Sequence, residues 1–262
     1  MGIPPMTKTR RSVLRGIGAG TVIVGASGLA SAQPFADDDS DAARVRVLHA
    51  SPDAPAVDVF VDGAAVLEGV TFTTLSGYLE LPAGSYEVAV APAGAGVDSA
   101  VIETSLTLSA DTDYTVAAVN RLADITAEVL VDDNDGDNGK ARVRAVHLSP
   151  DAPAVDVAQT DGPGVGNGSR VVAGGLSYRN ATGYLDLPPT AYTFEIRPAG
   201  ASTAVASFDA DLEPGATYTA FAVGLLNPDD EGQAFQVILS EDVASIPARA
   251  GNGRKRGRGR GN

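Results

Sequence analysis

Apolar and polar residues alternate with a period of two along much of this chain. After the turn at 82–84, the side chains of Tyr86, Val88 and Val90 form one such series, and the stretches 102–108 and 114–118 form two more. This alternation places one kind of side chain on one face of a β-strand. Gly, Pro and Asp interrupt it every ~8–12 residues, which is the spacing of strands in all-β domains. The pattern predicts many short strands, and no stretch favours an amphipathic helix.

A long motif occurs twice. Residues 44–59 read RVRVLHASPDAPAVDV, and residues 142–157 read RVRAVHLSPDAPAVDV. A G-Y-L-x-L-P block follows at 77–82 and again at 183–188. The offset between the copies grows from 98 to 106, so the second copy carries an eight-residue insertion, which we place within Gly162–Gly175. Such internal similarity predicts two tandem domains of the same fold.

Each copy holds about seven predicted strands, which favours an antiparallel β-sandwich. We therefore expect an all-β protein with two tandem antiparallel β-sandwich domains of immunoglobulin-like topology. Because the chain has no Cys and no Trp, the tyrosines that recur in pairs are expected to anchor the cores. The predicted segments are a signal peptide at 1–32, an acidic linker at 33–43, repeat 1 at 44–131, a second acidic linker at 132–141, repeat 2 at 142–243 and a basic tail at 244–262.

The position of the charges matters more than their sum of −14. Of the 19 Lys and Arg, four lie in 1–32 and six in 249–262, and neither segment holds an acid. The body between them has all 33 acids and nine cations, a net charge of −24. Such a body is not expected to bind nucleic acid, since phosphate recognition needs clustered Lys and Arg. It suits concentrated salt, which screens self-repulsion; an ordinary acidic secreted protein is the alternative.

The first 32 residues have the order of an export signal. Arg10 and Arg11 precede a Gly/Ala-rich apolar stretch at 16–30, which leads to an A-x-A site ending at Ala32. The adjacent arginines indicate the twin-arginine route. The stretch is shorter than the ~20 residues of a membrane span, although an uncleaved anchor is the alternative. We expect cleavage between Ala32 and Gln33 and a mature chain without a transmembrane segment.

The repeated motif contains the only two histidines of the chain, and two aspartates follow each of them. Imidazole and carboxylate groups ligate divalent metals, so one interpretation is a metal or small-ligand site. The alternative, which we favour, is structural: S-P-D-A-P forms a turn whose Ser and Asp side chains cap backbone N–H groups, and the last Asp lies on the outward face of the next strand. The spacing of His49, Ser51 and Asp53 does not suit a catalytic triad. The candidate metal ligands are His49, Asp53, Asp58, His147, Asp151 and Asp156.

Three other segments carry candidate chemistry. The acidic run at 132–139 resembles a calcium loop, but an EF-hand would need Gly at Asn138 and Glu at Arg144, so we predict a solvated linker. Weak Ca²⁺ or Mg²⁺ binding there is the alternative. Asn167 and Asn180 begin N-glycosylation sequons. The Gly/Arg-rich tail is predicted to be disordered, as a solvated end without a partner; docking on acidic cell-envelope or surface-layer components, or on the protein's own acidic body, is the alternative. Its cations nearest the end are Arg254, Lys255, Arg256, Arg258 and Arg260.

The motif H-x-S-P-D-A-P-x-V-D-V, followed by G-Y-L-x-L-P, resembles the family called domain of unknown function 4397 across both copies. The resemblance implies an exported or cell-surface β-sandwich protein, in a family with many members from halophilic archaea. It implies no activity, so no catalytic residue and no cofactor is assigned. We expect a non-enzymatic adhesion or envelope-interaction protein, with a metal-binding or small-ligand module and an extracellular hydrolase as the alternatives.

Overall fold

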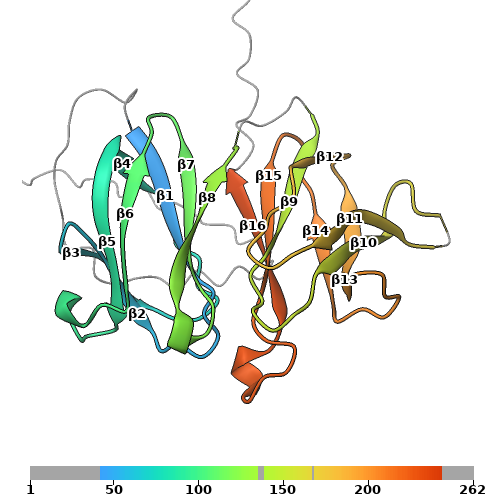
Figure 1. The fold of residues 1–262 in the computed structure, drawn as a ribbon. Coiled ribbons are helices and arrows are strands. Elements are labelled where there is room, and N and C mark those ends of the chain that lie inside the picture. Colours follow the sequence, from blue (N-terminus) through green and yellow to red (C-terminus); the bar gives the residue numbers. More distant parts are fainter. Residues whose placement is uncertain (1–41, 135–138, 167, 244–262) are drawn as a thin grey trace, which may run out of the picture. The chain divides into compact units, whose positions relative to one another are not determined.

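A computed structural model describes residues 42–134, 139–166 and 168–243, and these form sixteen β-strands (Figure 1). The strands of repeat 1 are β1 (Ala42–His49), β2 (Val57–Val61), β3 (Ala64–Val70), β4 (Leu79–Pro82), β5 (Gly84–Pro92), β6 (Ile102–Leu108), β7 (Asp113–Val119) and β8 (Thr126–Asp132). The strands of repeat 2 are β9 (Ala141–His147), β10 (Val155–Asp161), β11 (Arg170–Leu176), β12 (Leu185–Leu187), β13 (Ala191–Pro198), β14 (Ala206–Asp211), β15 (Thr217–Val223) and β16 (Gln236–Val243). Three short 3₁₀ turns complete the described elements: η1 (Val97–Ser99), η2 (Leu122–Asp124) and η3 (Glu231–Gln233).

Both repeats have the same topology, which confirms the predicted tandem β-sandwiches. Repeat 1 has the sheets β4-β1-β7-β8 and β3-β2-β5-β6, and repeat 2 has the equivalent sheets β12-β9-β15-β16 and β11-β10-β13-β14. All pairings are antiparallel except β1 with β7 and β9 with β15, which are parallel. The constant-type immunoglobulin sandwich divides seven strands four and three, whereas each repeat divides eight strands four and four.

The hairpin between β2 and β3 shows where the repeats differ. Asp62 and Gly63 have φ angles of 49° and 79°, the left-handed conformation that a two-residue type I′ turn requires. In repeat 2, β10 ends at Asp161 and β11 begins at Arg170, so a longer loop replaces this turn. The predicted insertion therefore lies in one hairpin and leaves the topology unchanged.

Each sandwich encloses its own apolar core. The core of repeat 1 is built on residues such as Val59, Val90 and Leu106, and that of repeat 2 on residues such as Phe194 and Ile196. Tyrosines anchor both cores, as predicted. The hydroxyl of one tyrosine of each repeat accepts a hydrogen bond from a loop N–H group of its own repeat; these tyrosines are Tyr114 (from Ser109, 3.1 Å) and Tyr218 (from Glu213, 3.0 Å). Another recurring pair, Tyr78 and Tyr184, lies outside the cores and is described below.

The strands β7 and β15 are buried at all seven of their positions. Period-two reasoning assigns one face of each strand to its sandwich core. The opposite face is also buried, because it belongs to a third apolar cluster that contains residues of both repeats. That face also carries buried polar residues, Thr115 in β7 and Thr219 in β15, so neither strand reads as a continuous apolar run.

The predicted segment limits differ slightly from the strand ends. Strand β1 begins at Ala42, inside the predicted first linker, and β9 begins at Ala141. Strand β8 ends at Asp132, so this residue does not belong to the second linker. The predicted signal peptide with Arg10, Arg11, Ala32 and Gln33, and the basic tail at 244–262, lie outside the described residues. Within the described part of the chain, no helix is long and apolar enough to cross a membrane.

Candidate functional site

The two motif histidines are fully buried at the ends of β1 and β9. The Nε2 atom of His49 lies 3.0 Å from the carbonyl oxygen of Pro55, and His147 makes the same contact with Pro153. Because a carbonyl only accepts, Nε2 carries the proton. In repeat 2, the N–H of Ser149 donates to Nδ1 of His147 at 3.3 Å. Burial lowers the pKa of both imidazoles, so each is a neutral group that ties a strand end to the following turn.

The first aspartate of each motif caps a distant loop. A carboxylate oxygen of Asp53 accepts from the N–H of Leu122 at 2.7 Å. In repeat 2, Asp151 accepts from the two successive N–H groups of Leu226 and Asn227, at 2.8 and 2.9 Å. Both carboxylates therefore cap backbone N–H groups, as predicted, and these groups belong to the loop that follows β7 or β15. The predicted cap by Ser51 is absent, because its buried hydroxyl has no hydrogen-bond partner among the described residues.

The second aspartate of each motif bridges two backbone segments. Asp58 accepts from the N–H groups of Gly69 and Gly94, at 2.7 and 2.8 Å. Asp156 makes the equivalent bonds, with Gly175 at 2.7 Å and Gly200 at 2.9 Å, and these bonds lower the pKa of its carboxyl. Asp58 is only 7% exposed, so it does not simply project from an outward face as predicted.

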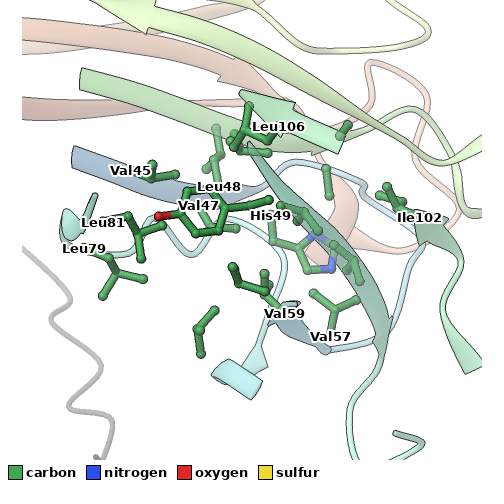
Figure 2. Close-up of a pocket in the computed structure, with 18 of the residues that line it drawn as sticks. Val45, Val47, Leu48, His49, Val57, Val59, Leu79, Leu81, Ile102 and Leu106 are labelled. Carbon is green, nitrogen blue, oxygen red and sulfur yellow. The ribbon is translucent and has the colours of Figure 1, made fainter. Parts of the chain in front are cut away.

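The structure does not bring the candidate metal ligands together. Within the described ranges, no three His, Cys, Asp or Glu side chains lie where they could hold a metal ion. Each sandwich also contains an apolar cavity, of about 40 Å³ in repeat 1 and about 30 Å³ in repeat 2. Figure 2 shows the first, with Val57, Val59 and Leu106 around it and His49 beside it. These cavities are spaces between the apolar side chains of the two sheets, and they contain no set of convergent polar groups.

A buried group of four charged side chains joins the two repeats. We call Arg46, Asp132, Arg144 and Asp242 the four-charge cluster; the arginine side chains are 3% exposed and the carboxylates fully buried. Arg46 of repeat 1 pairs with Asp242 of repeat 2 at 2.7 Å, and Arg144 of repeat 2 pairs with Asp132 of repeat 1. Each repeat thus supplies one cation and one anion, and the cluster is neutral.

Two threonines complete the cluster in the same way on both sides. The Nε of Arg46 donates to Thr115 at 2.8 Å, and Thr115 donates to Asp132 at 2.6 Å. In repeat 2, the Nε of Arg144 donates to Thr219 at 2.9 Å, and Thr219 donates to Asp242. These bonds compensate part of the desolvation that buried charges suffer. Burial nevertheless raises the pKa of Asp242, against the opposing effect of Arg46.

The tyrosine pair Tyr78 and Tyr184 covers the arginines of the four-charge cluster. The guanidinium of Arg46 lies 4.8 Å from the ring centroid of Tyr78, and that of Arg144 lies 5.1 Å from Tyr184. These distances allow cation–π contacts. Burial raises the pKa of Tyr184 to about 12, although Arg144 lowers it. These two tyrosines therefore pack against the arginines of the four-charge cluster, each within its own repeat, where sequence reasoning expected them in a sandwich core.

An apolar cluster accompanies the charges on the faces where the repeats meet. Its buried members are Leu48, Ala50, Ala117, Val119 and Leu130 of repeat 1 and Val146, Leu148, Phe221 and Val223 of repeat 2. At the rim, Tyr178 donates to Asn120 at 2.6 Å, and Arg179 pairs with Glu128 at 2.5 Å. The two sandwiches therefore contact each other through a buried surface with a charged and an apolar part.

Sequence reasoning missed this surface, although two signals for it are present. The R-V-R triplet opens both copies of the motif and places Arg46 and Arg144 inside a strand. Both arginines alternate with apolar residues, so each lies on a regular strand face opposite the core. Asp132 was assigned to a solvated linker and is instead 5% exposed; its position at a strand end gave no indication of a buried partner. Asp133, the next residue, pairs with Arg142 at 2.7 Å.

The structure describes only one of the two glycosylation candidates. Asn167 lies outside the described residues. Asn180 is exposed, but the hydroxyl of Thr182, the third residue of its sequon, accepts from the N–H of Ala145 at 2.9 Å. Ser76 accepts from Val47 in the same way in repeat 1, where there is no sequon. The hydroxyl of Thr182 therefore has a structural role that does not depend on glycosylation.

Comparisons with known proteins give a family but no activity. The sequence model of the family described as "Domain of unknown function (DUF4397)" matches residues 43–158 and 165–257. No curated protein matches. Two solved structures are similar at 12% identity. One, a leucine-rich repeat protein from Bacteroides thetaiotaomicron, has a TM-score of 0.19 over 70% of this chain and 26% of that one, so this chain spans about a quarter of its length. The other is described as "Putative cell adhesion protein" and comes from Parabacteroides distasonis. It has a TM-score of 0.20, and the match covers 77% of this chain and 99% of that one. Scores this low establish no shared fold.

Proposed function

Because this chain belongs to the DUF4397 family, whose description assigns no activity, we propose its function from its own residues. In this proposal the chain is an exported, non-enzymatic protein of the cell surface. Its two sandwiches act together as an adhesion or envelope-interaction unit in concentrated salt. The basic tail, with its five cations between Arg254 and Arg260, is the segment proposed to dock on acidic envelope components.

The observation that carries the non-enzymatic part of this proposal is the bonding of the motif side chains. The imidazole of His49 and the carboxylates of Asp53 and Asp58 each bind a backbone group of the repeat. A general base or a metal ligand must instead direct its lone pair to a shared point that a substrate or ion can reach. The motif therefore supports a structural role, in which it joins strand ends to loops.

Charge and the contact between the repeats support the remaining part. A body with a net charge of −24 repels itself in dilute solution and is relieved where salt shortens the Debye length. The four-charge cluster is buried, so dissolved ions screen it much less than they screen the surface acids. A protein with these two properties keeps its repeats in contact at salt concentrations that remove most surface ion pairing.

Export is tested by changing the arginine pair in the cells that produce the protein. With Arg10→Lys and Arg11→Lys together, we expect the chain to accumulate inside the cell and to be lost from the surface and medium, because twin-arginine transport depends on that pair. A matched change at Lys8→Arg should leave its distribution unaltered. Equal export of the doubly substituted chain would contradict this part of the proposal.

The surface role is tested by affinity capture of envelope components in molar salt, with the full chain and with a chain that lacks residues 249–262. We expect the full chain to retain acidic envelope material and the truncated chain to retain several-fold less. A variant with Arg254, Lys255, Arg256, Arg258 and Arg260 replaced by Gln separates charge from length. Capture that is identical for all three proteins would remove the tail from the proposal, and no capture by any of them would remove envelope binding.

A further inference from the structure

The surface between the repeats is reciprocal in its charges. Repeat 1 presents Arg46 and Asp132, and repeat 2 presents Arg144 and Asp242 in the equivalent positions. The cation of each repeat binds the anion of the other, so the same contact is made twice. This is the arrangement of an isologous interface, which is normally formed by two separate subunits.

Apart from the linker, the two sandwiches are held together only by non-covalent contacts. Each repeat has its own apolar core, and the only chain connection between them runs from the end of β8 at Asp132 to the start of β9 at Ala141. Repeat 1 therefore recognises the surface of repeat 2, whichever chain that repeat belongs to. A repeat 2 from a second copy of the chain presents the same atoms.

The apolar part of the surface determines which repeats can pair. The small side chains of Ala50 and Ala117 in repeat 1 occupy the positions that Leu148 and Phe221 occupy in repeat 2. Phe221 also packs beneath Arg46, with 5.7 Å between the guanidinium carbon and the ring centroid. Two copies of repeat 1 would leave a void at these positions, and two copies of repeat 2 would overfill them.

The rim contacts favour the same pairing. Tyr178 and Arg179 of repeat 2 bind Asn120 and Glu128 of repeat 1. The positions equivalent to Tyr178 and Arg179 in repeat 1 are Phe72 and Thr73, which cannot make these bonds. Unlike repeats therefore fit each other in both packing and hydrogen bonding.

We propose that copies of this chain associate by exchanging repeats, with repeat 1 of one copy bound to repeat 2 of another through this same surface. The linker gives pairing within one chain an effective concentration of order millimolar. Exchange therefore becomes appreciable where copies are crowded, as on a shared surface. The partner is a second copy of the chain. Association between copies does not depend on the proposed location at the cell surface, so a failed test of one leaves the other standing.

Charge inversion tests the exchange in the full chain. The first variant carries Arg46→Asp and Asp132→Arg, and the second carries Arg144→Asp and Asp242→Arg. Within either variant alone, like charges meet at the contact and pairing of unlike repeats is opposed. In a mixture, repeat 1 of the first variant meets complementary charges on repeat 2 of the second, and the remaining two repeats have the native charges. We expect an equimolar mixture to sediment as a 1:1 dimer, with a Kd at least about a hundredfold lower than for either variant alone.

The variant with all four substitutions is the matched control, because its charges are complementary again within one chain. We expect it to sediment as a monomer at the same concentrations. A mixture that stays monomeric while circular dichroism shows both variants folded would overturn the proposal. Dimers of the first variant alone would overturn the pairing rule, since they require two copies of the same repeat to pack together.

A second measurement keeps the wild-type surface intact, in case a charge-inverted variant does not fold. A protease site replaces residues 135–138, and the chain is cut after folding. Isotope-labelled and unlabelled cut proteins are then mixed and followed by native mass spectrometry. We expect labelled repeat 1 to acquire unlabelled repeat 2 until the two pairings are equally populated. Failure of the labels to mix over days, or pairing of like repeats as often as unlike ones, would contradict the proposal.

Discussion

The motif histidine has one chemical state in the folded protein. In both repeats its Nε2–H donates to a proline carbonyl, and burial lowers its pKa. An aromatic ring lies edge-on to each imidazole. The distance between ring centroids is 6.3 Å for Phe72 and His49, and 6.0 Å for Tyr178 and His147. No charged group among the described residues contributes to the pKa shift of either imidazole, so a protonated ring would lack a compensating anion there. A protonated ring would still donate from Nε2, so what disfavours the protonated form is the burial of its charge.

This state predicts a pH dependence of stability. An unfolded histidine takes up a proton near pH 6.5, whereas His49 and His147 resist it, so the unfolded chain binds more protons below that pH. The free energy of unfolding should be constant above about pH 7 and fall as the pH drops below about 6.5, by up to about 1.4 kcal/mol per unit for each histidine.

Urea unfolding between about pH 5.5 and pH 7.5 measures this effect, in a window above the range where most carboxylates titrate. The variant with His49→Gln and His147→Gln is the control: it should be less stable at neutral pH and show a flatter pH profile. A wild-type profile that is flat, or that rises as the pH falls, would mean that the imidazoles are not buried as neutral groups.

At the level of strands and loops, the alternating pattern predicted the β-sandwich architecture, and the repeated motif predicted its duplication. The two-residue turn at Asp62–Gly63 could be located from its sequence because few residues adopt its conformation. The second buried face of β7 and β15 could not, because alternation identifies one face and does not say what covers the other. The cap from Asp53 to Leu122 was also missed, since it joins positions 69 residues apart.

The loop after β15 depends on a glycine that local sequence explains only in part. Gly224 has a φ of 85°, and a Cβ atom there would lie 2.3 Å from the carbonyl oxygen of Ala234. Gly224→Ala should therefore destabilise the protein by about 1–3 kcal/mol, through both strain and the close contact. Gly183→Ala is the control, because a Cβ atom at Gly183 would meet nothing within 4 Å. Thermal unfolding of the two variants measures the difference; equal midpoints would contradict the loop geometry.

For the whole molecule, surface charge and buried charge respond differently to salt. The body carries −24, and its repulsion is screened as the Debye length falls from about 10 Å at 0.1 M to about 3 Å at 1 M. The urea midpoint should therefore rise steadily over that range of KCl. A variant with five exposed acids of the body replaced by Asn or Gln should show a smaller rise. Salt that lowers the midpoint of the wild-type chain would contradict adaptation to concentrated salt.

Charged side chains such as Arg and Asp are seldom buried, and the contact between the repeats explains why four of them are buried here. Removing one partner of a buried ion pair costs about 3–5 kcal/mol, because the other charge is left without compensation. The sequence showed the R-V-R triplets and the acids, but their pairing joins residues of different repeats, such as Arg46 and Asp242. Only the folded arrangement reveals that the four charges form one cluster.

Hydrogen exchange of the full chain, followed by mass spectrometry, tests most directly whether the four-charge cluster holds the repeats together. With Arg46→Asp, we expect exchange to accelerate by at least about tenfold in β7 and β15, the strands of both repeats that carry the contact, because breaking such a pair costs several kcal/mol. Strands β5 and β13, which lie in the other sheet of each sandwich, should change little. Adding Asp242→Arg should restore protection, since it re-forms the pair with reversed charges. Unchanged exchange in β15 after Arg46→Asp, or equal acceleration in β5 and β13, would contradict the account.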